Sequence, residues 1–276
     1  MRPRLVVPPG AGWETVSTEP PSPPETPTAW QPQRVADLYD DDPEIWAEVI
    51  GPTHHYHFGI VDPEADPEDA EAHFDFTVRS LYRWIPRGAR VLDLGCGWGG
   101  AARMLARERD AKMVGVTISA PQVAFYEQHV PGGRCVHADM AQLDIEERFD
   151  VGIALESFCH VDLPGASLAR IRGHVDRLVL LDHVSTGDSY EVEAWRMRFP
   201  SREEFRALVE GAGFRIVHDE ENDVPWVTAA RYWLRRVRAR FPEGPPDGQF
   251  RLLHDLCQQL VILDGSPTRS RLIVAE

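Results

Sequence analysis

The sequence of 276 residues carries 29 Lys and Arg against 44 Asp and Glu, a formal net charge of −15 at pH 7. This balance argues against a nucleic-acid partner, because phosphate binding needs a concentrated basic surface. No run approaches the roughly 20 apolar residues of a membrane-spanning helix, so no membrane span is expected.

The N-terminal third predicts a tail followed by helices. Residues 1–30 are rich in Pro, Ser, Thr and Glu and lack core-forming periodicity, so we expect a disordered tail. Residues 31–87 predict a helical cap. In it, apolar residues recur at helical spacing over 35–50, with a break near Pro43, and an amphipathic helix covers 70–85. The segment "GPTHHYHFGI" between them reads as a loop.

Residues 88–276 alternate short apolar strands with helices. We expect strands at 89–95, 112–119, 133–140, 149–157, 176–184, 214–220 and 270–276, and helices at 99–110, 121–130, 165–175 and 201–213. Continuous apolar strands separated by helices are typical of a parallel sheet covered on both faces. The fold class is therefore α/β, with a doubly wound, seven-stranded, mostly parallel Rossmann-like sheet. Two amphipathic helices over 225–263, inserted before the last strand, predict a lid.

The first of these strands runs into a glycine-rich loop, "VLDLGCGWGG". In a doubly wound sheet the ligand site lies at the carboxyl ends of the central strands, where this loop falls. Asp93, Gly95, Gly97 and Gly99 form the pattern D-x-G-x-G-x-G. This pattern resembles motif I of the class I S-adenosylmethionine-dependent methyltransferases. The resemblance implies that Asp93 and the glycine backbone support the methionine part of that cofactor.

The next two strand ends extend the resemblance. "GVTISAPQ" and "HADM" are similar to the subgroup that contains the cyclopropane fatty acid synthases and many natural-product methyltransferases. In that subgroup the residues matching Thr117, Ile118 and Gln122 hold the cofactor ribose. The resemblance assigns the adenine amino group to Asp139, with the backbone of Met140 nearby.

The fourth strand ends in "ALESFCHVDLP" and the fifth in "LLDHV". Glu156 and His160 are expected to face the cofactor methyl, with Asp182 at the neighbouring strand end. The segment resembles rebeccamycin-type sugar O-methyltransferases, in which a histidine base pairs with an aspartate of the next strand. It also resembles geranyl diphosphate C-methyltransferases, whose glutamate matches Glu156. If His160 is the base, the rate is expected to fall as pH drops through about 6 to 7.

The segment "THHYHFGI" and two tryptophans complete the candidate site. Three histidines suggest a metal, but no acidic or cysteine partner stands at a telling spacing, so we expect no metal site. Related enzymes carry a similar segment that closes over the cofactor, which implies that Tyr56 or His57 contacts the cofactor or the acceptor. Trp195 and Trp226 are candidates for the acceptor pocket.

These observations predict an enzyme that transfers a methyl group from S-adenosylmethionine to a small molecule of secondary metabolism, such as antibiotic biosynthesis. Transfer to oxygen or nitrogen, with His160 as base, is the first interpretation. Methylation of an electron-rich isoprenoid or aromatic carbon, with Glu156, is the alternative, and a non-catalytic cofactor-binding protein is a remote one. The four scattered cysteines predict reduced thiols and a cytoplasmic protein. The sequence is compatible with a homo-oligomer.

Overall fold

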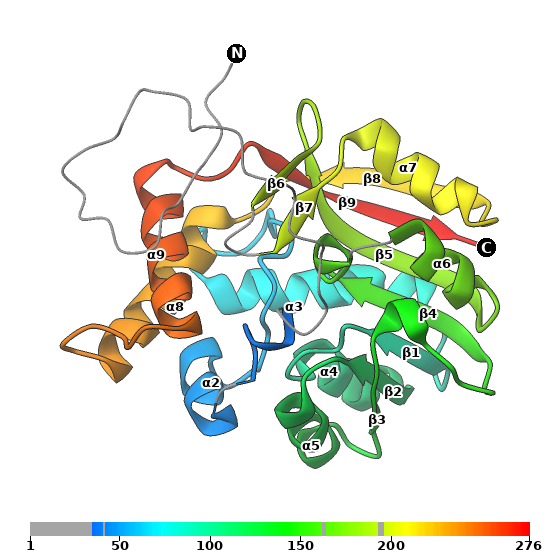
Figure 1. Cartoon of the computed structure of the whole chain (residues 1–276), viewed down its shortest axis with the longest axis horizontal. Helices are drawn as coiled ribbons and strands as arrows, with labels where there is room; N and C mark the ends of the chain where they lie inside the picture. The colour runs from blue at the N-terminus through cyan, green and yellow to red at the C-terminus, as the bar shows by residue number, and fades with distance from the viewer. Residues whose placement is uncertain (1–34, 41, 162–163, 193–195) are drawn as a thin grey trace, which may run out of the picture.

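The computed structural model describes residues 35–40, 42–161, 164–192 and 196–276, so the tail expected at 1–30 lies outside it. Its main sheet has seven strands in the order β3-β2-β1-β4-β5-β9-β8 (Figure 1). The strands are β1 (Arg90–Leu94), β2 (Lys112–Thr117), β3 (Arg134–His137), β4 (Phe149–Leu155), β5 (Val175–Ser185), β8 (Ile216–Asn222) and β9 (Thr268–Ala275). The neighbours from β3 to β5 pair in parallel, and β9 runs antiparallel to β5 and β8. The expected seven-stranded, mostly parallel sheet is confirmed.

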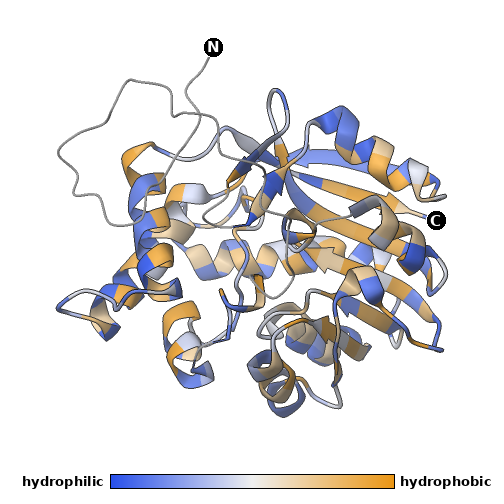
Figure 2. Cartoon of the chain, viewed as in Figure 1, coloured by the Kyte–Doolittle hydropathy of each residue, from blue (hydrophilic) through white to orange (hydrophobic). Residues whose placement is uncertain are grey.

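Helices cover both faces of the sheet. One core joins the strands to α3 (Ala70–Ser80), α4 (Gly100–Arg109) and α5 (Ala120–His129), and the other joins them to α6 (Pro164–Arg172) and α7 (Arg202–Gly211). Val91 and Leu92 are successive residues of β1 that belong to opposite cores, and both are fully buried. Burial on both faces explains why the central strands β4 and β5 are largely apolar, seen mostly in orange in Figure 2.

The inserted segment does form two helices, α8 (Trp226–Arg240) and α9 (Gln249–Ile262), between β8 and β9. They pack with α2 (Pro43–Ile50) at one end of the sheet in a third core (Figure 1). At its centre Trp233 is 1% exposed, and its ring stacks on Phe74 of α3 at 5.5 Å. The two helices therefore share a core with the rest of the protein, and their role as a lid stays a prediction.

Two local features differ from the expected elements. The helix expected over 70–85 ends at Ser80 and continues as a short 3₁₀ helix, η1 (Leu81–Trp84). A second sheet, absent from the expected elements, pairs β6 (Tyr190–Val192) with β7 (Met197–Phe199). Strands of three residues are too short to show a period of two in the sequence. None of the helices in the described ranges is long and apolar enough to span a bilayer.

The packing of α8 predicts a large loss of stability for Trp233→Ala. Truncating a buried tryptophan leaves a cavity, and we expect the free energy of unfolding in urea to fall by about 3–5 kcal/mol in a single transition. Ile262→Ala is the control, because Ile262 is 64% exposed on α9 and surface changes are usually within about 0.5 kcal/mol. Equal, small effects of both variants would mean that α8 is a detachable lid after all.

Candidate functional site

A cavity opens at the carboxyl edge of the sheet, above β1 and β4, where the strand order reverses. It holds about 1120 Å³ of empty space, part of it open to solvent. Most of the residues singled out in the sequence line it: Tyr56, His57, Asp93, Gly95, Gly97, Thr117, Ile118, Gln122, Asp139, Met140, Glu156 and His160. Side chains from four strand ends, the 52–60 loop and the segment before α2 thus meet in one place.

The glycines of the loop after β1 are needed for different reasons. At Gly97 an added Cβ would meet nothing within 4 Å, and it would project from the cavity wall at a positive φ of 50°. At Gly95 it would lie 2.4 Å from the Cβ of Ser157, and at Gly99 2.8 Å from Val130. Gly99 does not line the cavity within the described residues. The expectation that Gly99 contacts the cofactor is therefore replaced by close packing against α5, and Gly97 is the glycine that leaves room for a ligand.

The carboxylate of Asp93 fits the amino-acid end of the cofactor. Asp93 is 4% exposed, and its Oδ2 atom has no hydrogen-bond partner among the described residues. Burial raises the pKa of this carboxyl to about 7. A buried oxygen without a donor is costly, and an ammonium group bound against it would both satisfy the oxygen and favour the carboxylate. Together with the open space at Gly97, these features fit S-adenosylmethionine.

The ends of β2 and β3 present polar groups beside this position. The Thr117 hydroxyl donates to Oε1 of Gln122 at 2.6 Å, which leaves the amide nitrogen of Gln122 as the group able to donate to a ligand. Oδ1 of Asp139 accepts from the amide of Ala141 at 2.8 Å and caps the short helix η2 (Met140–Gln142). Asp139 therefore caps a turn and also lines the cavity, and this position is compatible with the expected contact to the adenine amino group.

Glu156 is held by contacts on both sides. Its carboxylate accepts hydrogen bonds from the amides of Phe58 at 2.7 Å and Gly59 at 2.6 Å, and it lies 3.0 Å from Nε2 of His183 on β5. Burial alone would raise the pKa of Glu156, but the His183 imidazole, His57 and the Gly59 amide lower it to about 2. The same contact raises the pKa of His183 against the effect of its own burial. Glu156 is thus an ionised anchor for the 52–60 loop, with its oxygens already engaged.

His160 lies on the 3₁₀ helix η3 (Phe158–His160) and is held in one tautomer. Its Nδ1 lies 3.0 Å from the carbonyl oxygen of Arg196, which can only accept a hydrogen bond, so Nδ1 carries the proton. Nε2 is then the basic nitrogen, and it faces the Tyr39 hydroxyl at 3.0 Å. Burial lowers the pKa of His160 to about 4. Tyr39 lines the cavity as well, although nothing in the sequence distinguished it from its neighbours in a helical pattern.

Asp182 does not have the expected role beside His160. Its oxygens accept hydrogen bonds from the amides of Cys159 at 3.1 Å and His183 at 2.8 Å, whereas the imidazole of His160 is bonded to Tyr39 and Arg196. Asp182 is 1% exposed and does not line the main cavity in the part of the chain that the structure describes. It ties η3 to β5, which corrects the expectation of a histidine–aspartate pair.

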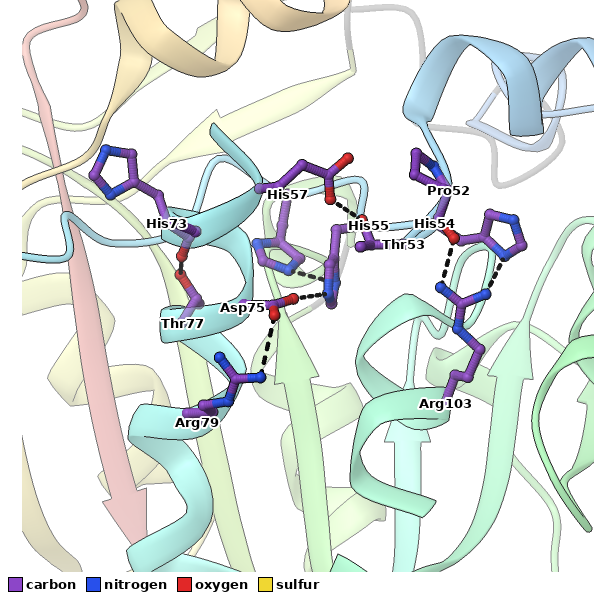
Figure 3. A network of polar contacts seen from close by, with 12 residues as sticks. Pro52, Thr53, His54, His55, His57, His73, Asp75, Thr77, Arg79 and Arg103 are labelled. Carbon is purple, nitrogen blue, oxygen red and sulfur yellow. Dashed lines mark hydrogen bonds and ion pairs between the residues drawn. The ribbon is translucent and has the colours of Figure 1, made fainter. Parts of the chain in front are cut away.

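The histidines of the 52–60 loop act as ties (Figure 3). Nε2 of His57 lies 3.2 Å from Nδ1 of His55, whose Nε2 lies 3.3 Å from Asp75 on α3. Burial lowers the pKa of His57 to about 3, so this ring is neutral. On the other side, Arg103 of α4 donates to the carbonyl of Pro52 at 2.7 Å. His55 and Asp75, which the sequence did not single out, thus fix the 52–60 loop, which carries Tyr56.

Trp226, a candidate for the acceptor pocket, does not belong to the cavity wall in the described residues. Trp226 packs under the 52–60 loop, with its ring 4.3 Å from that of Phe58 and 4.6 Å from that of His183. Trp226 thus packs against His183, the residue that contacts Glu156, and within the described ranges it does not line the cavity. Trp195 lies outside the described residues.

Comparisons with known proteins agree with this site. Residues 91–177 match a family described as a methyltransferase domain. An O-methyltransferase of Penicillium expansum is 29% identical over 67% of this chain and 74% of its own length. The cyclopropane-fatty-acyl-phospholipid synthase of Escherichia coli K12 is 42% identical, but over only 27% of this chain and 19% of that protein.

The fold recurs in solved structures. The cyclopropane synthase MmaA2 from Mycobacterium tuberculosis superposes with a TM-score of 0.73 over 88% of this chain and 98% of that one, at 16% identity. At that identity the likeness concerns the fold. The motif at Asp93–Gly100 and the cavity at the switch point agree with these matches. Residues 91–177 thus match a methyltransferase domain, and the sheet has the fold typical of the class I S-adenosylmethionine-dependent methyltransferases.

Proposed function

We propose that the enzyme methylates an oxygen or nitrogen atom of a small-molecule acceptor, with His160 as the base. The observation that carries this proposal is the tautomer of His160: the carbonyl of Arg196 holds the proton on Nδ1, which leaves Nε2 as the basic nitrogen of a residue that lines the cavity. The similarity to the fungal O-methyltransferase supports the same chemistry. Secondary metabolism is the setting that we infer for the acceptor.

When bound, S-adenosylmethionine supplies the methyl group, and its sulfonium sulfur serves as the leaving group. The protein has to hold the acceptor in line, exclude water and take up a proton. Asp93, Gln122 and Asp139 would hold the cofactor at the three strand ends. Tyr56 would cover it from the 52–60 loop, and the neutral His160 would receive the proton that a hydroxyl or amine loses.

Carbon methylation with Glu156 as the base is the second candidate, and the geometry supports it less. Both oxygens of Glu156 are engaged by backbone amides and His183, and its pKa is held at about 2. Such a carboxylate is a weak base and is not free to turn toward an acceptor. Its negative charge could still stabilise a cationic intermediate, which keeps this chemistry testable. A non-catalytic role would leave the fixed tautomer of His160 without a purpose.

A panel of acceptors tests the proposal directly. Radiolabelled S-adenosylmethionine is offered with a polyphenol, a secondary amine, geranyl diphosphate and vesicles of unsaturated phospholipid, and mass spectrometry locates the added methyl group. Transfer to oxygen or nitrogen is expected. Transfer to carbon alone would favour the second candidate, and titration of the protein with no binding of S-adenosylmethionine would overturn both.

Gly97→Leu should abolish cofactor binding while the protein stays folded, because a branched side chain would fill the space open beside Gly97. Isothermal titration with S-adenosylhomocysteine measures the effect. Gly132→Leu is the matched control: Gly132 also has a positive φ, 65°, and open space around it, but it lies outside the cavity. Equal loss of binding in both variants would show that backbone strain, and not the cavity, is responsible.

The pH dependence of the rate should follow the lowered pKa of His160. A base must be neutral to accept a proton, so kcat is expected to stay level down to about pH 5 and to fall through about pH 4. Saturating cofactor keeps the titration of Asp93, at about 7, out of this profile. The fall in rate at pH 6 to 7, which a histidine of ordinary pKa predicts, is therefore expected at about pH 4 instead. A limb there would mean that His160 is solvated or is not the base.

Two substitutions separate the chemistries. His160→Ala should lower the single-turnover rate by about 10²–10⁴-fold with cofactor affinity preserved. Glu156→Gln should lower the free energy of unfolding by about 3–5 kcal/mol, because it leaves His183 without its buried partner. We expect a smaller loss of rate in the folded Glu156→Gln protein than in His160→Ala. The reverse ranking, at temperatures where both proteins are folded, would select carbon methylation.

A further inference from the structure

The basic nitrogen of His160 is covered by another residue. The Tyr39 hydroxyl lies 3.0 Å from Nε2, and the two residues are 121 positions apart in the chain. Since Nδ1 of His160 carries the proton, Nε2 must accept, and the tyrosine hydroxyl donates to it. An acceptor in the cavity therefore meets the Tyr39 oxygen on its way to the base.

Tyr39 is held in this position by its surroundings. Its ring lies edge-on to that of His160 at 5.9 Å, and it contacts the rings of Trp46 and Tyr56, each at 6.2 Å. Burial, with a smaller contribution from Cys159, raises the pKa of the phenol, so the hydroxyl keeps its proton. On the other side of His160, Arg196 has a positive φ of 49°, an unusual conformation for a residue with a side chain. The pair is constrained from both ends.

A tyrosine in this arrangement has an oxygen that donates to His160 and still has lone pairs for a second partner. We propose that Tyr39 is a further catalytic residue, which passes the proton of the methyl acceptor to His160. This inference rests on the proposed function, because it takes His160 as the final base. It removes the need for Tyr39 to swing away from the aromatic rings that pack around it.

The proton transfers balance without any other reactant. As the acceptor oxygen or nitrogen bonds to the methyl carbon, the carbon–sulfur bond breaks and the sulfur leaves as a neutral thioether. In the same step the acceptor's bond to hydrogen breaks, and its proton joins the Tyr39 oxygen. The Tyr39 O–H bond breaks in the same event, and that proton joins Nε2 of His160. The imidazolium is stabilised by the carbonyl of Arg196, to which Nδ1 donates. After product leaves, the proton returns through Tyr39 to water, which restores the starting tautomer.

Tyr39→Phe tests the step, because it removes the hydroxyl and keeps the ring. In single turnovers with the acceptor found in the panel, we expect a loss of about 10²–10⁴-fold, similar to that of His160→Ala. The double variant should be no slower than either single one, since two residues of one pathway are not additive. Cofactor affinity should not change. Tyr232→Phe is the control: its hydroxyl bonds Glu71 outside the cavity.

Two measurements distinguish the shuttle from a packing role. The proton inventory in mixed H₂O and D₂O should be curved, because two protons move together, whereas a direct transfer to His160 would make it linear. ¹⁵N NMR of the complex with S-adenosylhomocysteine should show His160 protonated at Nδ1 alone, and this test needs no acceptor.

Each outcome has a separate meaning. A proton on Nε2 of His160 would overturn the shuttle. A fast Tyr39→Phe beside a slow His160→Ala would overturn the shuttle and leave the proposed function standing. A fast His160→Ala would overturn both.

Discussion

The buried contact between Glu156 and His183 organises the site. Glu156 follows β4, His183 lies on β5, and the carboxylate between them also receives the amides of Phe58 and Gly59. One ionised group thus joins two strands of the sheet to the loop that forms the cavity wall. Burying a charge is unfavourable unless it is paired and hydrogen-bonded, and here each requirement is met by a different part of the chain. Glu156 accepts a positive φ of 50° to reach them.

The same contact explains why the histidines near the cavity differ in pKa. Burial lowers the pKa of His57 to about 3 and of His160 to about 4, because removal from water disfavours the charged ring. His183 is just as buried, yet its pKa is raised, since a carboxylate lies 3.0 Å away. A lowered pKa suits a residue that must accept a proton as a neutral ring, and a raised pKa suits the partner of a buried carboxylate. The position of Glu156 therefore separates the two roles.

The aromatic wall formed by α2, α8 and α9 extends this support. Trp226 packs on His183 and Phe58, and Trp98 of the glycine loop lies 5.7 Å from Trp46 of α2. The loop at the first strand end and the 52–60 loop are therefore backed by one apolar core. This core supports the two loops, which in turn line the cavity. It also explains why Trp226, expected in the acceptor pocket, packs in this core instead.

The order of strands and helices, the cofactor and the strand ends that line the cavity follow from the sequence by itself. These features depend on periodicity and short motifs, in which the residues that act together are near neighbours, as in Asp93–Gly100. The tertiary structure alone decided the partners of each group. Tyr39 meets His160 across 121 positions and Glu156 meets Phe58 across 98, and no local pattern encodes such pairs. It also decided that Asp182 supports η3, that Gly99 packs against α5 and that Glu156 is an anchor. The chemistry of a buried polar group is set by the groups that replace its water, and these come together only when the chain folds.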